Sequence, residues 1–227
     1  MNKIIKWLLD GDVSLQYQTY RDLLDTDKPE LRQRIPLEGW GAALLSRCGN
    51  NGHWGKGFYS PKWTSTHYTL LDLKNLAFPP ENRKIKKSLE LVLKHEKGTD
   101  GGINPARTRH NSDVCVNGMV MNYASYFQTK QGHLNSIVDF LLSQQMPDGG
   151  FNCHSNQKGA THSSLHTTLS VAEGILEYGR NGYSYKLNGL KRAELGAQEF
   201  ILQHRVYRSD KTGDIINKKF LRFPYPS

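Results

Sequence analysis

The chain has 227 residues, of which 37% are hydrophobic, and its 30 Lys and Arg against 21 Asp and Glu give a formal net charge of +9. This length is enough for one sizeable core and short for two, so we expect a single domain over residues 1–227. No apolar run approaches the roughly 18 residues of a membrane-spanning helix, which excludes a membrane-embedded class, and the basic excess favours an anionic partner.

The cysteines indicate the compartment. Cys48, Cys115 and Cys153 are odd in number and widely spaced, unlike a disulfide framework. Thiols of this kind are typical of a reducing compartment. The N-terminus has only a brief apolar run, interrupted by Lys6, and no cleavage site of small residues. We therefore predict a soluble, cytoplasmic protein.

Two kinds of helical segment alternate along the chain. The first kind is poor in charge and starts at N-cap residues, Asp12, Ser65, Asp113 and Ser164, whose side chains accept a backbone N–H of the first turn. The second kind has apolar residues at helical spacing and charges elsewhere, and lies within residues 79–97, 132–146 and 188–204. We expect the first kind to lie inside and the second outside. The basic run at 82–90 then reads as a solvated outer face.

Polar turns rich in Gly and Asp close the outer helices. The stretch "VLKHEKGTDGGI" (92–103) is echoed by "FLLSQQMPDGGF" (140–151), and more loosely at 44–55 and 200–215. The glycines supply the positive φ angles that stop a helix and turn the chain. The chain therefore consists of about four helical hairpins of about fifty residues each.

Such hairpins build either an open α-solenoid or a ring, the α/α toroid. Aligned without gaps, the inner helices place His67, Cys115 and His166 at one repeat position. In a ring the starts of the inner helices converge, which would bring these three side chains together. We predict an all-α fold, an incomplete α/α toroid of about four hairpins. The tail 217–227 reads as the approach to a fifth inner helix, so we expect a chain truncated at its C-terminus or completed by a partner subunit or a second copy.

The turn "QMPDGGF" resembles the Q-x-x-x-G-x-W/F element of the terpenoid cyclases and protein prenyltransferase β subunits, which are α/α toroids. Gln145, Gly149 and Phe151 occupy the matching positions. The resemblance implies the same toroid for most of this chain.

A second motif is similar to the zinc-dependent prenyltransferases. Arg107, His110, Asp113 and Cys115 follow the family's spacing of two basic residues, Asp and x-Cys, with His110 where the family usually has Lys. The resemblance implies zinc ligands at Asp113, Cys115 and His166, with His162 as a rival one turn before His166. It also implies a diphosphate held by Arg107, Arg109, His110 and His67, and a prenyl pocket lined by residues such as Tyr123.

Structural interpretations of the same residues stay open. Asp113 is also a good N-cap, Cys115 a good small buried hydrophobe, and His67 and His166 can be core histidines. Arg107 and Arg109 can belong to an ordinary loop. We interpret Cys153 and His154, at the end of an outer helix, as structural.

The functional prediction is a prenyltransferase-like protein that binds an isoprenoid diphosphate, with zinc lowering the pKa of a thiol acceptor. One alternative is a relative of the squalene-type cyclases that lacks the acidic D-x-D-D motif. Others are a carbohydrate-active enzyme using Asp12 and Asp113, and a non-enzymatic toroid that binds another anionic ligand. We do not expect a nucleic-acid partner.

Overall fold

The computed structural model describes residues 2–105 and 111–222, and over these residues the predicted all-α fold is confirmed. The described residues form no β-strand beyond the isolated bridges Lys97–Ile103 and Arg208–Ile215. None of the described helices is long and apolar enough to cross a membrane. The helices are α1 Lys3–Leu9, α2 Val13–Leu23, α3 Pro29–Arg34, α4 Gly39–Ser46, α5 Thr66–Asn75, α6 Arg83–His95, α7 Val114–Tyr126, α8 Gln131–Ser143, α9 Ser155–Lys158, α10 Leu165–Arg180, α11 Leu187–Gln203 and the 3-10 helix η1 Lys218–Leu221.

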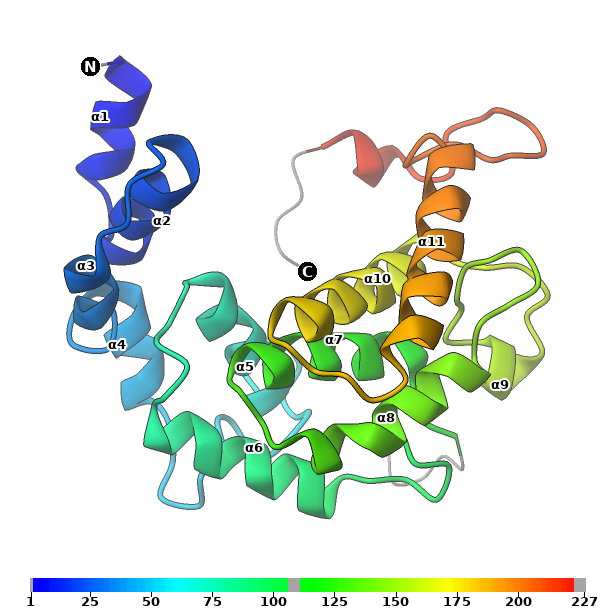
Figure 1. Ribbon diagram of the computed structural model, residues 1–227, viewed down its shortest axis with the longest axis horizontal. Coiled ribbons are helices and arrows are strands. Elements are labelled where there is room, and N and C mark those ends of the chain that lie inside the picture. Colours follow the sequence, from blue (N-terminus) through cyan, green and yellow to red (C-terminus); the bar gives the residue numbers. More distant parts are fainter. Residues whose placement is uncertain (1, 106–110, 223–227) are drawn as a thin grey trace. The chain divides into compact units, whose positions relative to one another are not determined.

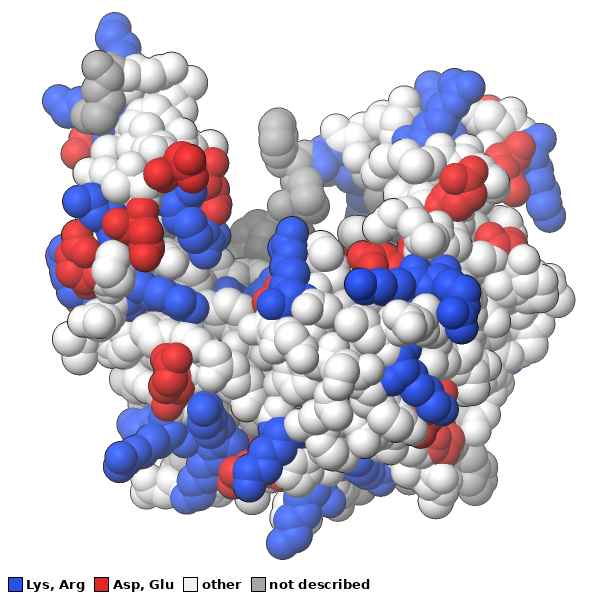
Figure 2. All heavy atoms as spheres, viewed as in Figure 1, with Lys and Arg blue, Asp and Glu red and all other residues white. Residues whose placement is uncertain are grey.

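The two predicted kinds of helix both form. Helices α2, α5, α7 and α10 begin directly after the four predicted N-cap residues, and α6, α8 and α11 occupy the three predicted outer segments. Most of α7 is buried, as predicted for an inner helix, whereas α10 exposes Leu169 and Leu176. Lys and Arg side chains gather over α6 in Figure 2, and Arg83, Lys84 and Lys87 are exposed, as predicted for an outer face.

The predicted capping bonds form at only one of the four N-cap residues. Asp12 accepts the Ser14 N–H over 2.9 Å, while Ser65, Asp113 and Ser164 make no side-chain capping bond. Asp113 instead accepts a hydrogen bond from Gln157 Nε2 over 2.6 Å. The capping prediction was therefore right about where these helices begin and wrong about the bonds at three of them.

Backbone contacts divide the chain into two compact units, Met1–Leu91 (the first unit) and Val92–Ser227 (the second unit), with the boundary inside α6. A single domain and a closing ring stay predictions.

In the second unit, α10 packs along α7, and α11 packs against α10 and α8 (Figure 1). The two inner helices cross where Gly118 of α7 meets Gly174 of α10. A Cβ atom at Gly118 would lie 2.6 Å from the Ser170 carbonyl oxygen, and one at Gly174 would overlap the Gly118 carbonyl oxygen. Only glycine at these two positions allows the backbones to come this close.

The Gly-Asp turns of the second unit share one set of hydrogen bonds. Asp100 accepts from the Ser112 N–H and hydroxyl, each over 2.7 Å, and Asp148 accepts from the Ser163 N–H and hydroxyl over 2.8 and 2.5 Å. Each carboxylate thus ties its turn to the segment that leads into the next inner helix. The sequence echo is therefore a structural repeat.

The apolar residue after each turn is also held by the following inner helix. Asn117 bonds the backbone N–H and C=O of Ile103, and Thr168 bonds those of Phe151. Both anchors are the fourth residue of their helix. In the first unit the corresponding bond, to the Trp54 N–H, comes from Thr66, which is the first residue of α5 and not the fourth. The anchoring residue of this repeat is therefore about one helical turn earlier than the gap-free alignment of the inner helices predicts.

Gln145 connects the Gly-Asp turn at 145–151 to the outer helix α11. Its side-chain amide donates to the carbonyl oxygens of Gly149 and Ala193, over 2.9 and 3.1 Å. Gly149 has φ +86, which glycine adopts without strain, and Phe151 is fully buried. Each of the three residues of the Q-x-x-x-G-x-F element therefore has a structural role in this turn.

Candidate metal centre

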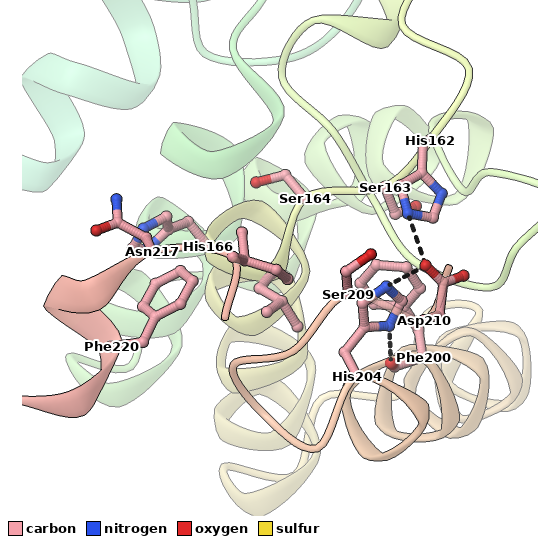
Figure 3. A pocket seen from close by; sticks show the side chains of 12 residues that line it. His162, Ser163, Ser164, His166, Phe200, His204, Ser209, Asp210, Asn217 and Phe220 are labelled. Carbon is pink, nitrogen blue, oxygen red and sulfur yellow. Dashed lines mark hydrogen bonds and ion pairs between the residues drawn. The ribbon is translucent and has the colours of Figure 1, made fainter. Parts of the chain in front are cut away.

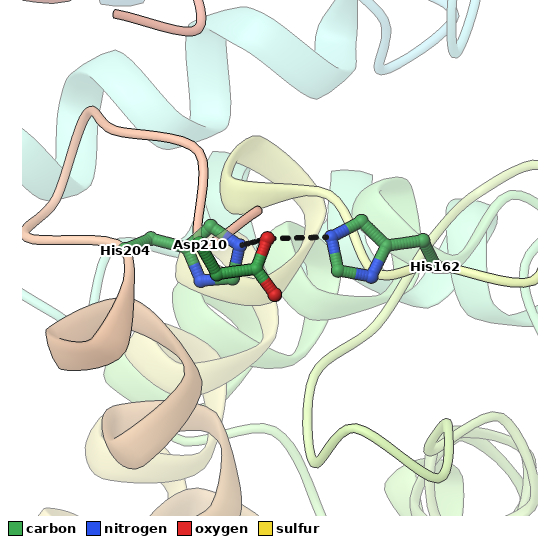
Figure 4. Close-up of side chains that lie close together, drawn as sticks. All are labelled: His162, His204 and Asp210. Carbon is green, nitrogen blue, oxygen red and sulfur yellow. Dashed lines mark ion pairs between the residues drawn. The ribbon is translucent and has the colours of Figure 1, made fainter. Parts of the chain in front are cut away.

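Three potential metal ligands from the second unit converge on one point. Ligand atoms of His162, His204 and Asp210 all lie within 4.8 Å of one another, and Figure 4 shows the Asp210 carboxylate between the two rings. Asp210 Oδ1 lies 3.4 Å from His204 Nε2 and 3.8 Å from His162 Nε2. The three residues come from the loop before α10, the C-cap of α11 and the turn that follows it.

The other ring nitrogen of each histidine is already engaged. His204 Nδ1 lies 2.7 Å from the Phe200 carbonyl oxygen, and because a carbonyl only accepts, Nδ1 carries the hydrogen. His162 Nδ1 lies 3.0 Å from Asp148 Oδ2, where it donates to the carboxylate. In the neutral form of each ring, Nε2 then offers its lone pair toward Asp210. A histidine ligand commonly has this outer partner, which fixes its tautomer and orientation.

Asp148 bonds both His162 and the segment that closes its turn. Burial raises the pKa of its carboxyl, but the Ser163 hydroxyl, the Ser163 and Gly150 N–H groups and His162 outweigh this and lower it. A charged Asp148 therefore both closes the turn and orients the His162 ring. The same bond set at Asp100 has no histidine among its described hydrogen bonds.

A pocket of about 370 Å³ adjoins the three ligands. Figure 3 shows His162, His204 and Asp210 at one end and His166, Asn217 and Phe220 at the other. The His166 and Phe220 ring centroids are 4.9 Å apart. The whole lining is His162, Ser163, Ser164, Leu165, His166, Phe200, His204, Ser209, Asp210, Ile216, Asn217 and Phe220. The polar cluster at one end and the Phe220 ring at the other suit a ligand with a polar head and an apolar body.

The donor set fits a divalent transition-metal ion. Two imidazoles and one carboxylate are a common ligand set for zinc and for non-haem iron, and three protein ligands leave coordination positions open. His204 is 3% exposed, so one donor is fixed inside the fold, while Asp210 is exposed on a turn. The arrangement can therefore hold an ion and still present it to a ligand in the pocket.

The structure places the residues of the predicted zinc site apart from this centre or at its edge. Asp113 bonds Gln157, the Cys115 N–H donates to Cys153 Sγ over 3.0 Å, and His166 is exposed on the pocket wall. Within residues 2–105 and 111–222, only His162, His204 and Asp210 form a group of three ligands at metal-binding distances. The structure thus does not bring Asp113, Cys115 and His166 together in that way, and their zinc site stays a prediction.

The predicted diphosphate and prenyl contacts fall into two groups. Arg107, Arg109 and His110 lie outside the described residues. His67 and Tyr123 are fully buried. His67 lies in the first unit among Phe58, Tyr59 and Tyr68, with ring centroids 5.0 to 5.5 Å away, and burial lowers its pKa to about 3.

Cys153, interpreted as structural from the sequence, has a thiol partner. A hydrogen bond from the Cys115 thiol lowers the pKa of Cys153, against the effect of burial, and a bond from the Thr167 hydroxyl adds to this. The pKa of Cys115 is raised by the same thiol hydrogen bond and by burial. The pKa values of the two neighbouring thiols are therefore shifted in opposite directions.

Sequence reasoning considered His162 only as a rival ligand and missed His204 and Asp210. Both belong to the irregular fourth echo, residues 200–215, where the Gly-Asp turn departs from the pattern of the others. The sequence signal that could have indicated them is the presence of a histidine and an aspartate within a turn that otherwise follows the repeat. Nothing in their spacing indicated that this segment would lie over the start of α10.

Comparisons with protein-family models, with curated proteins and with solved structures find no match to this chain.

Proposed function

We propose that this chain binds a divalent transition-metal ion, zinc above all, at His162, His204 and Asp210, and uses it to hold an anionic ligand in the adjoining pocket. The observation that carries the proposal is the convergence of two imidazole Nε2 atoms and one carboxylate oxygen at one end of a 370 Å³ pocket. The outer bonds to Phe200 and Asp148 support it, because they leave both Nε2 atoms available.

The ligand class we favour is an isoprenoid diphosphate, which makes the chain prenyltransferase-like. A bound ion would supply a positive charge and open coordination positions for the diphosphate oxygens. Leu165, Ile216 and Phe220 provide apolar surface for the isoprenoid tail, and His166 lies beside them as a second polar contact. The repeated hairpins are the reason that we propose an incomplete α/α toroid as the architecture that carries this site.

Metal content tests the first part of the proposal. We expect one zinc ion per chain by elemental analysis and calorimetry of the full chain. His204→Gln and Asp210→Asn should weaken zinc binding by at least about a hundredfold, since loss of an outer partner alone costs 10- to 100-fold. His133→Gln, at an exposed position on α8, is the matched control and should bind zinc normally.

A Cys115→Ser variant separates this centre from the zinc site predicted by the prenyltransferase resemblance. Zinc retained in Cys115→Ser and lost in His204→Gln supports the centre proposed here. The reverse pattern supports Asp113, Cys115 and His166 and contradicts our assignment. Zinc binding unaffected by both substitutions would contradict both sites.

Calorimetry with an isoprenoid diphosphate tests the ligand class. We expect micromolar binding to the zinc-loaded chain, weaker binding after chelation of the metal, and weaker binding to Phe220→Ala. Inorganic diphosphate should bind through the same ion with lower affinity, because it lacks the tail. Zinc binding without any binding of the isoprenoid diphosphate would leave the metal centre standing and overturn the ligand.

A further inference from the structure

Cys115 and Cys153 lie side by side in the second unit, although 38 positions separate them in sequence. The Cys115 backbone N–H donates to Cys153 Sγ over 3.0 Å, which places the Cys153 sulfur directly against residue 115. Both side chains are partly exposed, and neither is in a disulfide. A small reagent that reaches one sulfur therefore finds a second thiol within reach of it.

The surroundings of the two sulfur atoms are unequal. Cys153 Sγ accepts from the Cys115 N–H and, over 3.5 Å, from the Thr167 hydroxyl, in addition to the Cys115 thiol. The N–H belongs to the first turn of α7, where unpaired peptide dipoles favour negative charge. The Cys115 N–H and the Thr167 hydroxyl stabilise electron density on Cys153 Sγ, whereas the surroundings of Cys115 raise the pKa of its thiol. Cys153 is therefore the better nucleophile.

We propose that Cys153 and Cys115 form a thiol pair that reacts with hydroperoxides and closes to a disulfide. The Cys153 sulfur attacks the terminal oxygen of the peroxide and the O–O bond breaks. The departing oxygen leaves as hydroxide, or as alkoxide from an organic hydroperoxide, and takes up the proton that the Cys153 thiol loses. The resulting Cys153 sulfenic acid is attacked by the Cys115 sulfur, so that the S–S bond forms and the S–O bond breaks. The hydroxyl group leaves with the Cys115 proton as water, and two thiols have reduced one peroxide.

The disulfide forms next to the pocket but does not depend on it. Thr167, which bonds Cys153, directly follows His166 on the pocket wall. Oxidation would fix the turn before α9 to the start of α7, beside the first turn of α10. The inference goes beyond the proposed function and holds whether or not a metal or an isoprenoid binds.

The experiment uses the reduced full-length chain with one equivalent of hydrogen peroxide. We expect two of the three thiols to disappear, the intact mass to fall by about 2 Da as two hydrogens are lost, and peptide mapping to join 115 to 153. Cys48→Ser is the matched control, because Cys48 lies in the first unit with only the Gly49 carbonyl as its described hydrogen-bond partner. This variant should form the same disulfide at the same rate.

Three further variants assign the roles. Cys115→Ser should stop at a sulfenic acid on residue 153 that dimedone traps, and Cys153→Ser should leave Cys115 unreacted over the same time. Thr167→Val should slow the reaction about two- to tenfold, the factor of one ordinary hydrogen bond, with the same end product. The proposal is overturned if folded protein keeps both thiols, if Cys48 oxidises first, or if dimedone marks Cys115.

Discussion

His67 shows how burial shifts the pKa of a side chain in this protein. Its ring is fully buried in the first unit, and the loss of hydration lowers its pKa from 6.5 to about 3. Between these two pH values the unfolded chain binds a proton that the folded chain does not. The contribution of the neutral ring to stability is therefore complete above pH 6.5 and is lost as the pH falls toward 3.

We predict that the free energy of unfolding falls, through His67 alone, by up to about 1.4 kcal/mol per pH unit below pH 6.5. Urea unfolding between pH 4 and 8 measures this slope. His67→Leu should flatten it, while His133→Gln, at an exposed position, should leave it unchanged. A slope that is the same in His67→Leu as in the natural chain would show that other groups cause it.

Asp148 and Asp100 offer a matched pair of carboxylates, since they make equivalent bonds to Ser163 and Ser112. Alanine at either position should cost a similar free energy of unfolding, about 1–3 kcal/mol, because each leaves a serine without its partner. Only Asp148 also bonds His162. We therefore expect Asp148→Ala to weaken zinc binding about 10- to 100-fold and Asp100→Ala to leave it unchanged, as measured by calorimetry. Equal zinc affinity in the two variants would remove Asp148 from the metal centre.

The crossing of α7 and α10 depends on the absence of two side chains. Gly118→Ala would place a methyl group 2.6 Å from the Ser170 carbonyl oxygen, so the helices must separate. We expect thermal unfolding to show a loss of about 1–3 kcal/mol, the usual cost of overpacking. Gly132→Ala on α8 meets no atom within 4 Å and should instead raise stability by about 0.4–1 kcal/mol. Tolerance of Gly118→Ala would mean that the crossing is looser than described.

The helices could be predicted because their signals are local. Asp12, Ser65, Asp113 and Ser164 mark the starts of α2, α5, α7 and α10, and the Gly-Asp turns mark the ends of outer helices. The capping bonds could not be predicted, because Asp113 finds Gln157, a residue from another part of the chain. The cluster of His162, His204 and Asp210 was missed for the same reason. His204 and Asp210 meet His162 only through tertiary packing, which leaves no periodic pattern in the sequence.

Two compact units imply that the whole molecule responds unevenly to a ligand. All three proposed metal ligands belong to the second unit, and an ion that binds only folded protein stabilises the part that holds it. At a hundredfold excess over its Kd this amounts to about 2.7 kcal/mol.

We predict that scanning calorimetry resolves two transitions and that zinc raises the midpoint of one of them. His67→Leu should lower the other transition, and His204→Gln should abolish the zinc response. A single transition that zinc shifts as a whole would show that α6, which contains the boundary between the units, couples their unfolding.

Three consecutive residues, 162 to 164, each have a different duty in the second unit. His162 faces Asp210, and the backbone N–H of Ser163 donates to Asp148. Ser164 is the residue that directly precedes α10. Because the three residues are adjacent, inserting or deleting one residue here would change all three contacts together. His162 would turn away from Asp210, Ser163 would lose Asp148, and the start of α10 would shift. Natural or designed variants should accordingly differ in length only at residues 159–161, between the end of α9 and His162, where an added residue does not displace all three at once.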